Sequence, residues 1–522
     1  MVSEEAVKQL QKHIEELQHE LKSLRPRAAE LERENEALSE QIAWFRRYFL
    51  HRKADVVEDK SQQALPFDEA EQLSQHSETK SKNLQIVGEH SRRRPVRRPL
   101  PEDLPRERQI IDIPEEEKQC ACGHRMSRIG EEKSERLDIQ PPRLRVIEQV
   151  RPKYACHACE GSGDEEKPAV RIAAVPSMLI PGGIATAGLL SYIVTAKFCD
   201  ATPLYRQEKQ FQRLGVDLPR QTMADWMIAA ATASGPVYEA LERVLRSGPA
   251  VLIDETRVQV LKEPGRPNTN DSFAWAAVGG KPEHPVVLFR YDPTRSGQVA
   301  LDILGDYQGY VQSDGYAGYD WSLETLPGVV HVGCMAHVRR KFVDAANDGK
   351  NRASSNQALA VIAKIYAVEG ELKGLTRDQE FLTQRQTRVQ PLMDDLFAWI
   401  QTKATQVPPK SALGKAVSYA LNQWAKVERY LESPHLTPDT NRVENAIRPF
   451  VLGRKNWLFS GSPRGAKSSM ILYSLVETAK ANKVEPYWYL RRLFEALPSF
   501  PPEGDFAELL PWNIHSRPIQ TT

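Results

Sequence analysis

The sequence predicts a multidomain α/β protein whose central part combines a mixed β-sheet with helices. First, a chain of 522 residues is too long to fold around one core and should divide into several modules. Second, β-branched and aromatic runs separated by turn residues begin after residue 249. Third, segments on either side of these runs show the periodicity of helices. We therefore expect a sheet domain flanked by helical modules.

Residues 1–50 carry a seven-residue repeat of leucine that predicts a coiled coil. The repeated residues are Leu10, Leu17, Leu24, Leu31 and Leu38. Asn35 occupies one position of the other seam, where a single asparagine often selects a two-stranded register. We expect a leucine-zipper homodimer. The alternative is an amphipathic helix packed on its own chain.

Residues 51–108 are polar and rich in proline, and this composition predicts a linker without a core of its own. The segment 92–98 contains five arginines, which are Arg92, Arg93, Arg94, Arg97 and Arg98. Clustered arginine releases counterions from DNA, so the linker is also a candidate for binding phosphates. A purely solvated linker is the simpler interpretation, and the two are compatible.

Residues 109–165 contain two close pairs of cysteines, in CACGH and CHACE, on either side of the strand-like run RLRVIEQV. The four cysteines are Cys120, Cys122, Cys156 and Cys159. Together they are suitable ligands for one structural Zn²⁺ with tetrahedral geometry, and His124 or His157 is an alternative ligand. The other interpretation is two pairs of buried thiols.

Residues 170–247 show helical periodicity. The run PLYRQEKQFQRLGVDLPRQTMADWMIAAA predicts a helix, a turn at Gly215 and a second helix entered at Pro219. This order resembles a helix-turn-helix and makes Arg220 and Gln221, on the leading face of the second helix, candidates for DNA contacts. Many helical hairpins share the pattern without binding DNA, which is the alternative.

Residues 248–348 predict three antiparallel strands, a helix, a strand, a helix and a strand. That order is the one expected for a ribonuclease H-like catalytic core. Residues 349–437 are helical without strand signals and are interpreted as an insertion. Residues 438–485 close the sheet domain, and residues 486–522 form a C-terminal segment.

Three acidic residues are candidates for catalysis. Asp254 lies in the apolar strand LIDET, where an unpaired buried charge is unfavourable, and Asp314 ends the strand YVQSD before a glycine. A strand-end aspartate is most often a turn former, which is the alternative for Asp314. Glu444 opens a later helix, where a capping box with Asn441 or a pair with Arg448 is the structural alternative. We expect the three carboxylates to converge.

Such a carboxylate set suits hard divalent cations, which prefer oxygen ligands. Two Mg²⁺ or Mn²⁺ ions in a site of this kind activate the attacking oxygen and stabilise the leaving oxygen of an in-line phosphoryl transfer. Glu255 is a rival ligand to Asp254. Because neighbours along a strand point to opposite faces, we expect Glu255 to point away from the metals.

Basic residues surround Glu444. The stretch 441–467 holds six Lys/Arg side chains and one acid, which suits a site that binds a polyanion. The candidate DNA contacts in this part of the chain are Arg339, Arg340, Arg442, Arg448, Arg454, Lys455 and Trp457. Trp457 is a candidate for stacking on an unpaired base, with core packing as the alternative.

The bulk composition adds little about partners, because the formal net charge is only +1. No apolar run reaches the length needed to span a bilayer, and the N-terminus lacks the layout of a signal peptide. Two pairs of cysteines in so long a chain favour metal binding over a disulfide scaffold. We expect a soluble intracellular protein that does not bind membranes.

The words LIDET, SDGYAGY, GCMAHVRRKF and NRVENAIRPFVLGRKNWLFSGS together closely resemble the DDE transposases of the insertion sequence 66 family. The resemblance covers nearly the whole chain, to LYSLVETAK and EPYWYL near its end. It implies a ribonuclease H-like core that cuts double-stranded DNA at element ends and joins it to target DNA with Mg²⁺. The acids carried over are Asp254, Asp314 and Glu444. A bacterial, cytoplasmic and nucleoid-associated location, and small accessory proteins encoded by the same element, are also implied.

One sequence motif departs from the family's pattern, and another resembles a motif of a wider group of transposases. The first cysteine pair of the family resembles C-x-x-C-G, whereas Gln119 stands where the first cysteine would fall. Cys334 and His337 form a C-x-x-H word like that of several eukaryotic DDE transposase groups. The alternative is a buried cysteine followed by a histidine at a helix start.

Two other functions remain as alternatives. A zipper, a zinc module and a helix-turn-helix would suit a non-catalytic dimeric DNA-binding regulator, which leaves the three carboxylates unexplained. A metal-dependent nuclease that cuts DNA without strand transfer would use the same carboxylates.

Overall fold

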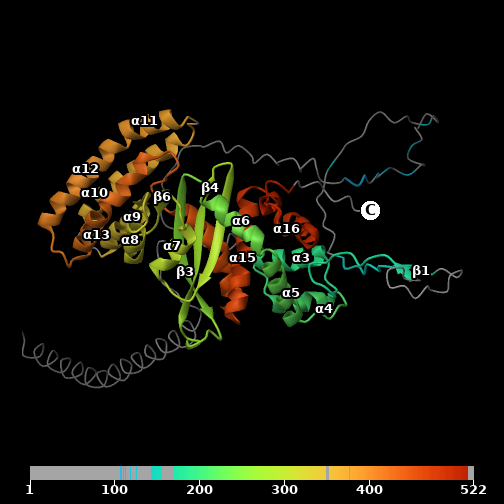
Figure 1. Ribbon diagram of the computed structural model, residues 1–522. Helices are drawn as coiled ribbons and strands as arrows, with labels where there is room; N and C mark the ends of the chain where they lie inside the picture. The colour runs from blue at the N-terminus through green and yellow to red at the C-terminus, as the bar shows by residue number, and fades with distance from the viewer. Residues whose placement is uncertain are drawn as a thin grey trace, which may run out of the picture. The chain divides into compact units, whose positions relative to one another are not determined.

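The computed structural model describes residues 143–155, 170–348, 352–375 and 377–514, together with a few positions between 106 and 134 (Figure 1). The chain divides into two compact units, with a boundary between Ala173 and Ala174. The leucines of the predicted zipper, the arginines of segment 92–98 and the four predicted zinc ligands lie outside the described residues.

The smaller unit contains two short strands, β1 (Lys153–Ala155) and β2 (Val170–Ile172), which pair antiparallel. The run RLRVIEQV, predicted as a strand, has no regular secondary structure, so that prediction is wrong. All eight of its residues, 143–150, are exposed, and no strand of the described chain pairs with them. β propensity reflects packing on a neighbouring strand, and this run has no neighbouring strand among the described residues.

The larger unit is built on one mixed sheet (Figure 1). Its strands are β3 (Ala250–Val260), β4 (Asp271–Lys281), β5 (His284–Asp292), β6 (Gly309–Gln312), β7 (Val329–Val332) and β8 (Phe459–Ser460). The order is β5-β4-β3-β6-β7, and β8 pairs with the far end of β3. The three strands predicted as antiparallel are antiparallel, whereas β3, β6 and β7 run parallel.

Helices alternate with the later strands and cover the sheet. After β5 the chain forms α7 (Gly297–Leu304), α8 (Ala317–Glu324) and α9 (Met335–Asn347), one following each of β5, β6 and β7. Near its end it forms α14 (Asn441–Trp457), α15 (Pro463–Ala481), α16 (Pro486–Ala496), η4 (Leu497–Ser499) and η5 (Phe506–Leu509). α14 packs against β3 and β4, and α15 packs against β5.

In the described part of the chain, the helices that precede the sheet are α3 (Ala187–Phe198), α4 (Leu204–Arg213), α5 (Arg220–Ala233) and α6 (Gly235–Leu245). The predicted pair of helices is α4 and α5, joined through Gly215, whose φ of +85° favours glycine. α5 packs on α15 and α6 packs on β4 and β5, so these helices belong to the same core as the sheet.

The edge of the sheet at β5 is covered by polar side chains of α15. Thr478 Oγ1 accepts from the Val287 amide (3.1 Å), and Ser474 Oγ accepts from the Phe289 amide (2.7 Å). Asn482 Nδ2 donates to the Pro285 carbonyl at 2.8 Å. These contacts satisfy backbone groups that an open edge strand would present to other chains.

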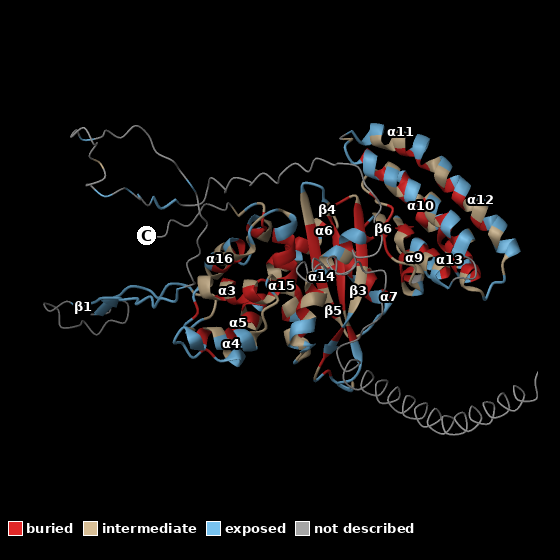
Figure 2. Ribbon diagram, turned by 180° about the vertical axis from the view of Figure 1, so that it is seen from behind, coloured by how far each residue is buried: buried red, intermediate tan, exposed pale blue. Residues whose placement is uncertain are grey.

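The predicted insertion is helical, with α10 (Arg352–Leu372), α11 (Asp378–Arg388), α12 (Gln390–Gln406), α13 (Ala412–Val427) and η3 (Glu428–Glu432). It shares a hydrophobic core with α9 and β7, separate from the main core of the sheet. Figure 2 shows the buried inner faces and exposed outer faces of these amphipathic helices.

A buried arginine organises the end of the insertion. The Arg385 guanidinium donates to both carboxylate oxygens of Glu369, at 2.9 and 2.8 Å. It also donates to the backbone carbonyls of Tyr430, Ser433 and Leu436. Only 1% of the Arg385 side chain is exposed, so these bonds replace its whole hydration. The contacts fix the chain segment that leads from η3 to α14.

We predict that Arg385→Met destabilises the protein by about 3–5 kcal/mol, because Glu369 is left buried without its partner. The measurement is the urea dependence of unfolding followed by circular dichroism. The matched control is Arg388→Met, one turn along α11, whose ion pair with Glu371 is on the surface. The control should lose less than about 1 kcal/mol. Equal losses in the two variants would show that the Arg385 contacts carry no special stability.

Candidate active site

The register of two parallel strands brings the first two acids together. β3 and β6 pair with Leu252 opposite Gln312. Asp254 and Asp314 each stand two residues further along, so continuation of the same register sets them side by side. Asp254 remains in β3, whereas Asp314 lies just beyond the end of β6.

Asp254 is in a strongly acidic environment. Its Oδ1 accepts from the Glu255 amide at 2.9 Å. Burial raises the pKa of Asp254 well above its ordinary value, and the charges of Glu255, Asp314 and Glu444 raise it further. Asp254 is therefore within electrostatic reach of both other predicted acids.

Asp314 is held by a local turn, as strand-end aspartates often are. Its Oδ1 accepts from the Tyr316 amide at 3.0 Å, an arrangement typical of an Asx turn. The preceding Ser313 is buried, and its hydroxyl lies 2.8 Å from Nε2 of His331 on β7. The turn-former interpretation and a role in the site are thus compatible for Asp314.

Glu444 lies in the first turn of α14, and the alternative interpretation, a capping box with Asn441, is wrong. The N-cap is Thr440, and Asn441 is the first helical residue. The Thr440 hydroxyl lies 3.2 Å from Glu444 Oε1 and 3.3 Å from Sγ of the buried Cys334. Its single hydrogen can serve only one of them at a time. The Thr440 amide also donates to Cys334 Sγ, so the starts of α9 and α14 are joined.

The charges of two of the predicted acids, Asp314 and Glu444, act on His337. Burial lowers its pKa, Arg340 lowers it further, and the charges of Asp314 and Glu444 act in the opposite direction. Its Nδ1 is buried and has no hydrogen-bond partner among the described residues. The signal available in the sequence was the C-x-x-H word, which places His337 one turn after Cys334.

Glu255 is engaged by other partners. Its carboxylate accepts from Arg295 and from the hydroxyl of the buried Tyr319. The Arg295 guanidinium in turn lies 3.9 Å from the centre of the Tyr316 ring. Glu255 is therefore paired with a cation, while its charge still acts on the nearby Asp254. Local sequence patterns could not predict this network, because Arg295 lies 40 residues from Glu255.

The donor set fits a divalent cation, although no three histidine, cysteine or carboxylate side chains of the described chain enclose one ion. Mg²⁺ is commonly held by one or two carboxylates, with water and substrate phosphates as the remaining ligands. The repulsion that raises the pKa of Asp254 is relieved when a cation binds beside it. Asp254, Asp314 and Glu444 are the residues that would hold such ions.

Most of the predicted DNA contacts among the described residues lie on the surface. Arg220, Gln221, Arg339, Arg442, Arg448 and Lys455 are exposed, and Arg340 and Arg454 are half-buried. Trp457 is half-buried as well, and its ring packs edge-on to Phe198 and under the Lys197 ammonium. These contacts are those of a packed side chain, which was the alternative interpretation for Trp457.

Residues 182–468, which include all three acids, match the family profile described as "Transposase IS66 family". The chain belongs to this family of transposases. Further profiles match residues 117–160 ("zinc-finger binding domain of transposase IS66"), 474–512 ("IS66 C-terminal element") and 37–108 ("Transposase C of IS166 homeodomain"). The matches extend the family over most of the chain.

Two relatives from Sinorhizobium fredii (strain NBRC 101917 / NGR234) illustrate the relationship. "Uncharacterized protein y4jD" is 35% identical over 427 residues, which cover 79% of this chain and 81% of the relative. "Uncharacterized protein y4qI" is 32% identical over 454 residues, which cover 84% of this chain and 81% of the relative.

Membership of the family makes the protein a nuclease or transferase of the transposase type that binds DNA. The matched domains imply a divalent metal in the catalytic domain and zinc in the cysteine-containing module. Within the described residues, no helix is both long enough and apolar enough to cross a membrane.

We predict that Asp254→Asn stabilises the protein at pH 7 in the presence of EDTA, because the substitution removes a charge that its neighbours repel. A gain of about 1 kcal/mol would raise Tm by roughly 2–4 °C in a domain of this size. The raised folded pKa means that the folded protein binds the proton more tightly than the unfolded chain. The stability of the wild type therefore falls as the pH rises from about 4 through the raised pKa.

The gain of Asp254→Asn should accordingly shrink as the pH is lowered toward 4, where wild-type Asp254 is protonated. Differential scanning calorimetry over this pH range measures the effect. Asp217→Asn, at an exposed position, is the control and should leave Tm unchanged. A loss of stability in Asp254→Asn at pH 7 would contradict the repulsion.

Proposed function

We propose that the protein binds the ends of an insertion sequence, cleaves phosphodiester bonds there and transfers the 3′-hydroxyl ends to target DNA. The observation that carries this proposal is the parallel register of β3 and β6, which sets Asp254 beside Asp314 within the matched transposase domain. The charges of both Asp314 and Glu444 raise the pKa of Asp254, which supports the inclusion of Glu444. The sheet order, with three antiparallel strands followed by two parallel strands, supports a ribonuclease H-like core.

Each of the three acids is positioned by a different structural element. Asp254 is fixed by the central strand, Asp314 by its Asx turn, and Glu444 by the first turn of α14. When bound, two Mg²⁺ or Mn²⁺ ions would supply charge stabilisation for an in-line phosphoryl transfer. The acids would hold these ions and keep the scissile phosphate between them, while the basic residues of α14 bind the flanking backbone.

The predicted zipper homodimer would bring two DNA ends together, and small accessory proteins of the same element belong to the proposal as partners. A nuclease without strand transfer is the second candidate, because the same carboxylates suffice for cleavage. The two differ in one product, the joined molecule of element end and target.

The test is incubation of the full-length chain with labelled element-end DNA, unlabelled target DNA and Mg²⁺. Joined products support the transposase, and cleavage without joining supports the nuclease. Binding with neither product would leave only a DNA-binding regulator.

We predict that Glu444→Gln lowers cleavage and joining at least about 100-fold, because even outer-shell partners of a metal commonly contribute 10–100-fold. The readout is the initial rate on the labelled end DNA, with DNA affinity measured separately by fluorescence anisotropy. Glu239→Gln, at an exposed position of α6, is the matched control. Full joining activity in Glu444→Gln would remove Glu444 from the catalytic set.

We also predict that the purified protein contains about one equivalent of zinc, because the predicted cysteine ligands complete one tetrahedral site. Cys156→Ser should lose most of this zinc, whereas Cys199→Ser, outside the predicted module, should keep it. Elemental analysis by mass spectrometry measures both. Equal zinc in the wild type and Cys156→Ser would exclude Cys156 as a ligand.

A further inference from the structure

Two large apolar side chains project from the surface directly after α14. Leu458 is 58% exposed and Phe459 is 45% exposed. Single exposed apolar side chains are common on proteins and need no explanation. An adjacent pair at the end of the helix that carries Glu444 is a different case.

The backbone at Leu458 is strained. Its φ of +65° and ψ of −49° lie in a region that residues with a side chain rarely adopt. Among the described residues, the other non-glycine residues with positive φ are Ala201, Lys262 and Lys483, so Leu458 alone combines this strain with a large apolar side chain. Such strain persists only where surrounding contacts enforce it, and it is concentrated at functional sites.

Contacts on the N-terminal side of the pair enforce this conformation. Trp457 packs inward, with the Lys197 ammonium 3.9 Å from its ring centre and Phe198 edge-on at 6.4 Å. A side chain at position 453 would collide with the Trp457 ring, so Gly453 is what lets the indole fold back over the last turn of α14. With Trp457 held inside, the chain turns at Leu458.

Contacts on the C-terminal side fix the pair to the sheet. Phe459 and Ser460 form β8, which pairs with Gln259 and Val260 of β3. The Leu261 amide also donates to the Ser460 carbonyl at 2.9 Å. Phe459 is thus paired with the same strand that carries Asp254, and Leu458 directly precedes it.

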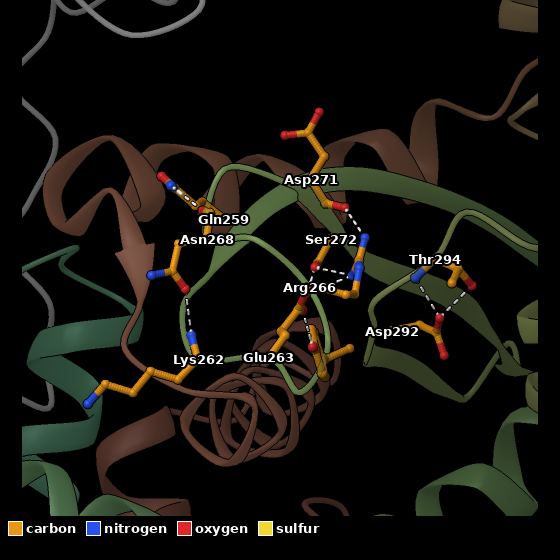
Figure 3. Close-up of polar contacts among 10 residues, drawn as sticks. Gln259, Lys262, Glu263, Arg266, Asn268, Asp271, Ser272, Asp292 and Thr294 are labelled. Atoms are coloured by element: carbon orange, nitrogen blue, oxygen red, sulfur yellow. Dashed lines mark hydrogen bonds and ion pairs between the residues drawn. The ribbon is translucent and has the colours of Figure 1, made fainter.

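The loop that joins β3 to β4, residues 261–270, is itself well ordered by polar contacts (Figure 3). The buried Glu263 accepts from Arg266, from the Ser272 hydroxyl and from the Tyr291 hydroxyl. Asn268 Oδ1 accepts from the Lys262 amide at 2.8 Å. The loop is joined to β8 by the bond from the Leu261 amide to the Ser460 carbonyl.

The surface around the pair carries positive charge. From Asn445 to Met470 the chain contains five basic residues and no acidic residue. Lys455, Arg464 and Lys467, which flank the pair in sequence, are exposed. This charge complements a phosphate backbone and not an apolar protein surface.

The distance from the pair to the acids follows from element geometry. Asp254 and Gln259 are five residues apart in β3, or about 17 Å at the rise of a strand. Glu444 and Leu458 are fourteen residues apart, or about 21 Å along α14. At about 3.4 Å per base pair, these lengths correspond to roughly five or six base pairs of DNA.

We propose that Leu458 and Phe459 form an apolar wedge that inserts into duplex DNA and unstacks a base step about five or six base pairs from the scissile phosphate. The inference rests on the proposed function, because it needs DNA at the acids. Insertion of apolar side chains between base steps is an established way for proteins to kink DNA, and it is sequence-tolerant. The flanking lysines and arginines hold the backbone on either side of the kink.

The test measures base unstacking directly. A set of duplexes of the element end carries 2-aminopurine, one position at a time, within about ten base pairs on either side of the cleavage position. The full-length chain is added with Ca²⁺ in place of Mg²⁺, so that binding is measured apart from cleavage. We expect fluorescence to rise at least about 2-fold at one step roughly five or six base pairs from that position and not elsewhere.

The test variant is Leu458→Gly/Phe459→Ala, in which glycine accepts the positive φ and the basic residues are kept. The fluorescence rise should disappear, while DNA affinity falls by less than about 10-fold because the phosphate contacts remain. The matched control is Ile184→Ala. Ile184 is a 79% exposed apolar residue just before α3, and this variant should behave as the wild type.

Three results would overturn the inference. If the wild type binds and cleaves end DNA without a fluorescence rise at any position, the wedge is wrong and the proposed function stands. If the double variant changes the oligomeric mass in solution and keeps the rise, the pair is a subunit interface. If the wild type binds no end DNA, the proposed function and the wedge both fail.

Discussion

The pairing of β3 with β6 is the constraint on which the rest of the larger unit depends. β3 has an antiparallel neighbour on one side and a parallel neighbour on the other, and the parallel register sets Asp254 beside Asp314. Because side chains alternate along a strand, a shift of one residue would send Asp254 to the opposite face of the sheet. The long apolar ladder between β3 and β4 fixes that register, since most of its residues are buried.

The acids repel one another, and contacts with neighbouring residues hold them in place. Glu255, the additional carboxylate beside Asp254, is matched by Arg295 and Tyr319. The third acid is positioned by contacts outside the sheet. Arg385 fixes the segment after η3, and Thr440 joins the start of α14 to Cys334. The helical insertion thus has a structural task in the site although it contributes none of the three acids.

The sequence was sufficient for elements whose pattern is local. The alternating apolar strands, the acid in LIDET and the acid before a glycine in SDG were all recognisable, and the order of strands and helices along residues 248–348 followed from the same local patterns. Where the determining contact is distant, local patterns failed. RLRVIEQV has strand composition without a partner strand, and Asn441 has capping chemistry although Thr440 takes the N-cap position. The inward packing of Trp457 depends on Lys197, which lies 260 residues earlier in the chain.

The order in which the acids occur along the chain has a consequence for synthesis. Glu444 follows Asp254 by 190 residues, and α15, which covers the edge strand β5, comes later still. At about 5–20 residues per second, a ribosome needs roughly 10–40 s to pass from the first acid to the third. During that interval the nascent chain holds at most two of the three carboxylates and an uncovered sheet edge. On the proposed function, cleavage would require α14 to have been made, because a product truncated before α14 lacks Glu444.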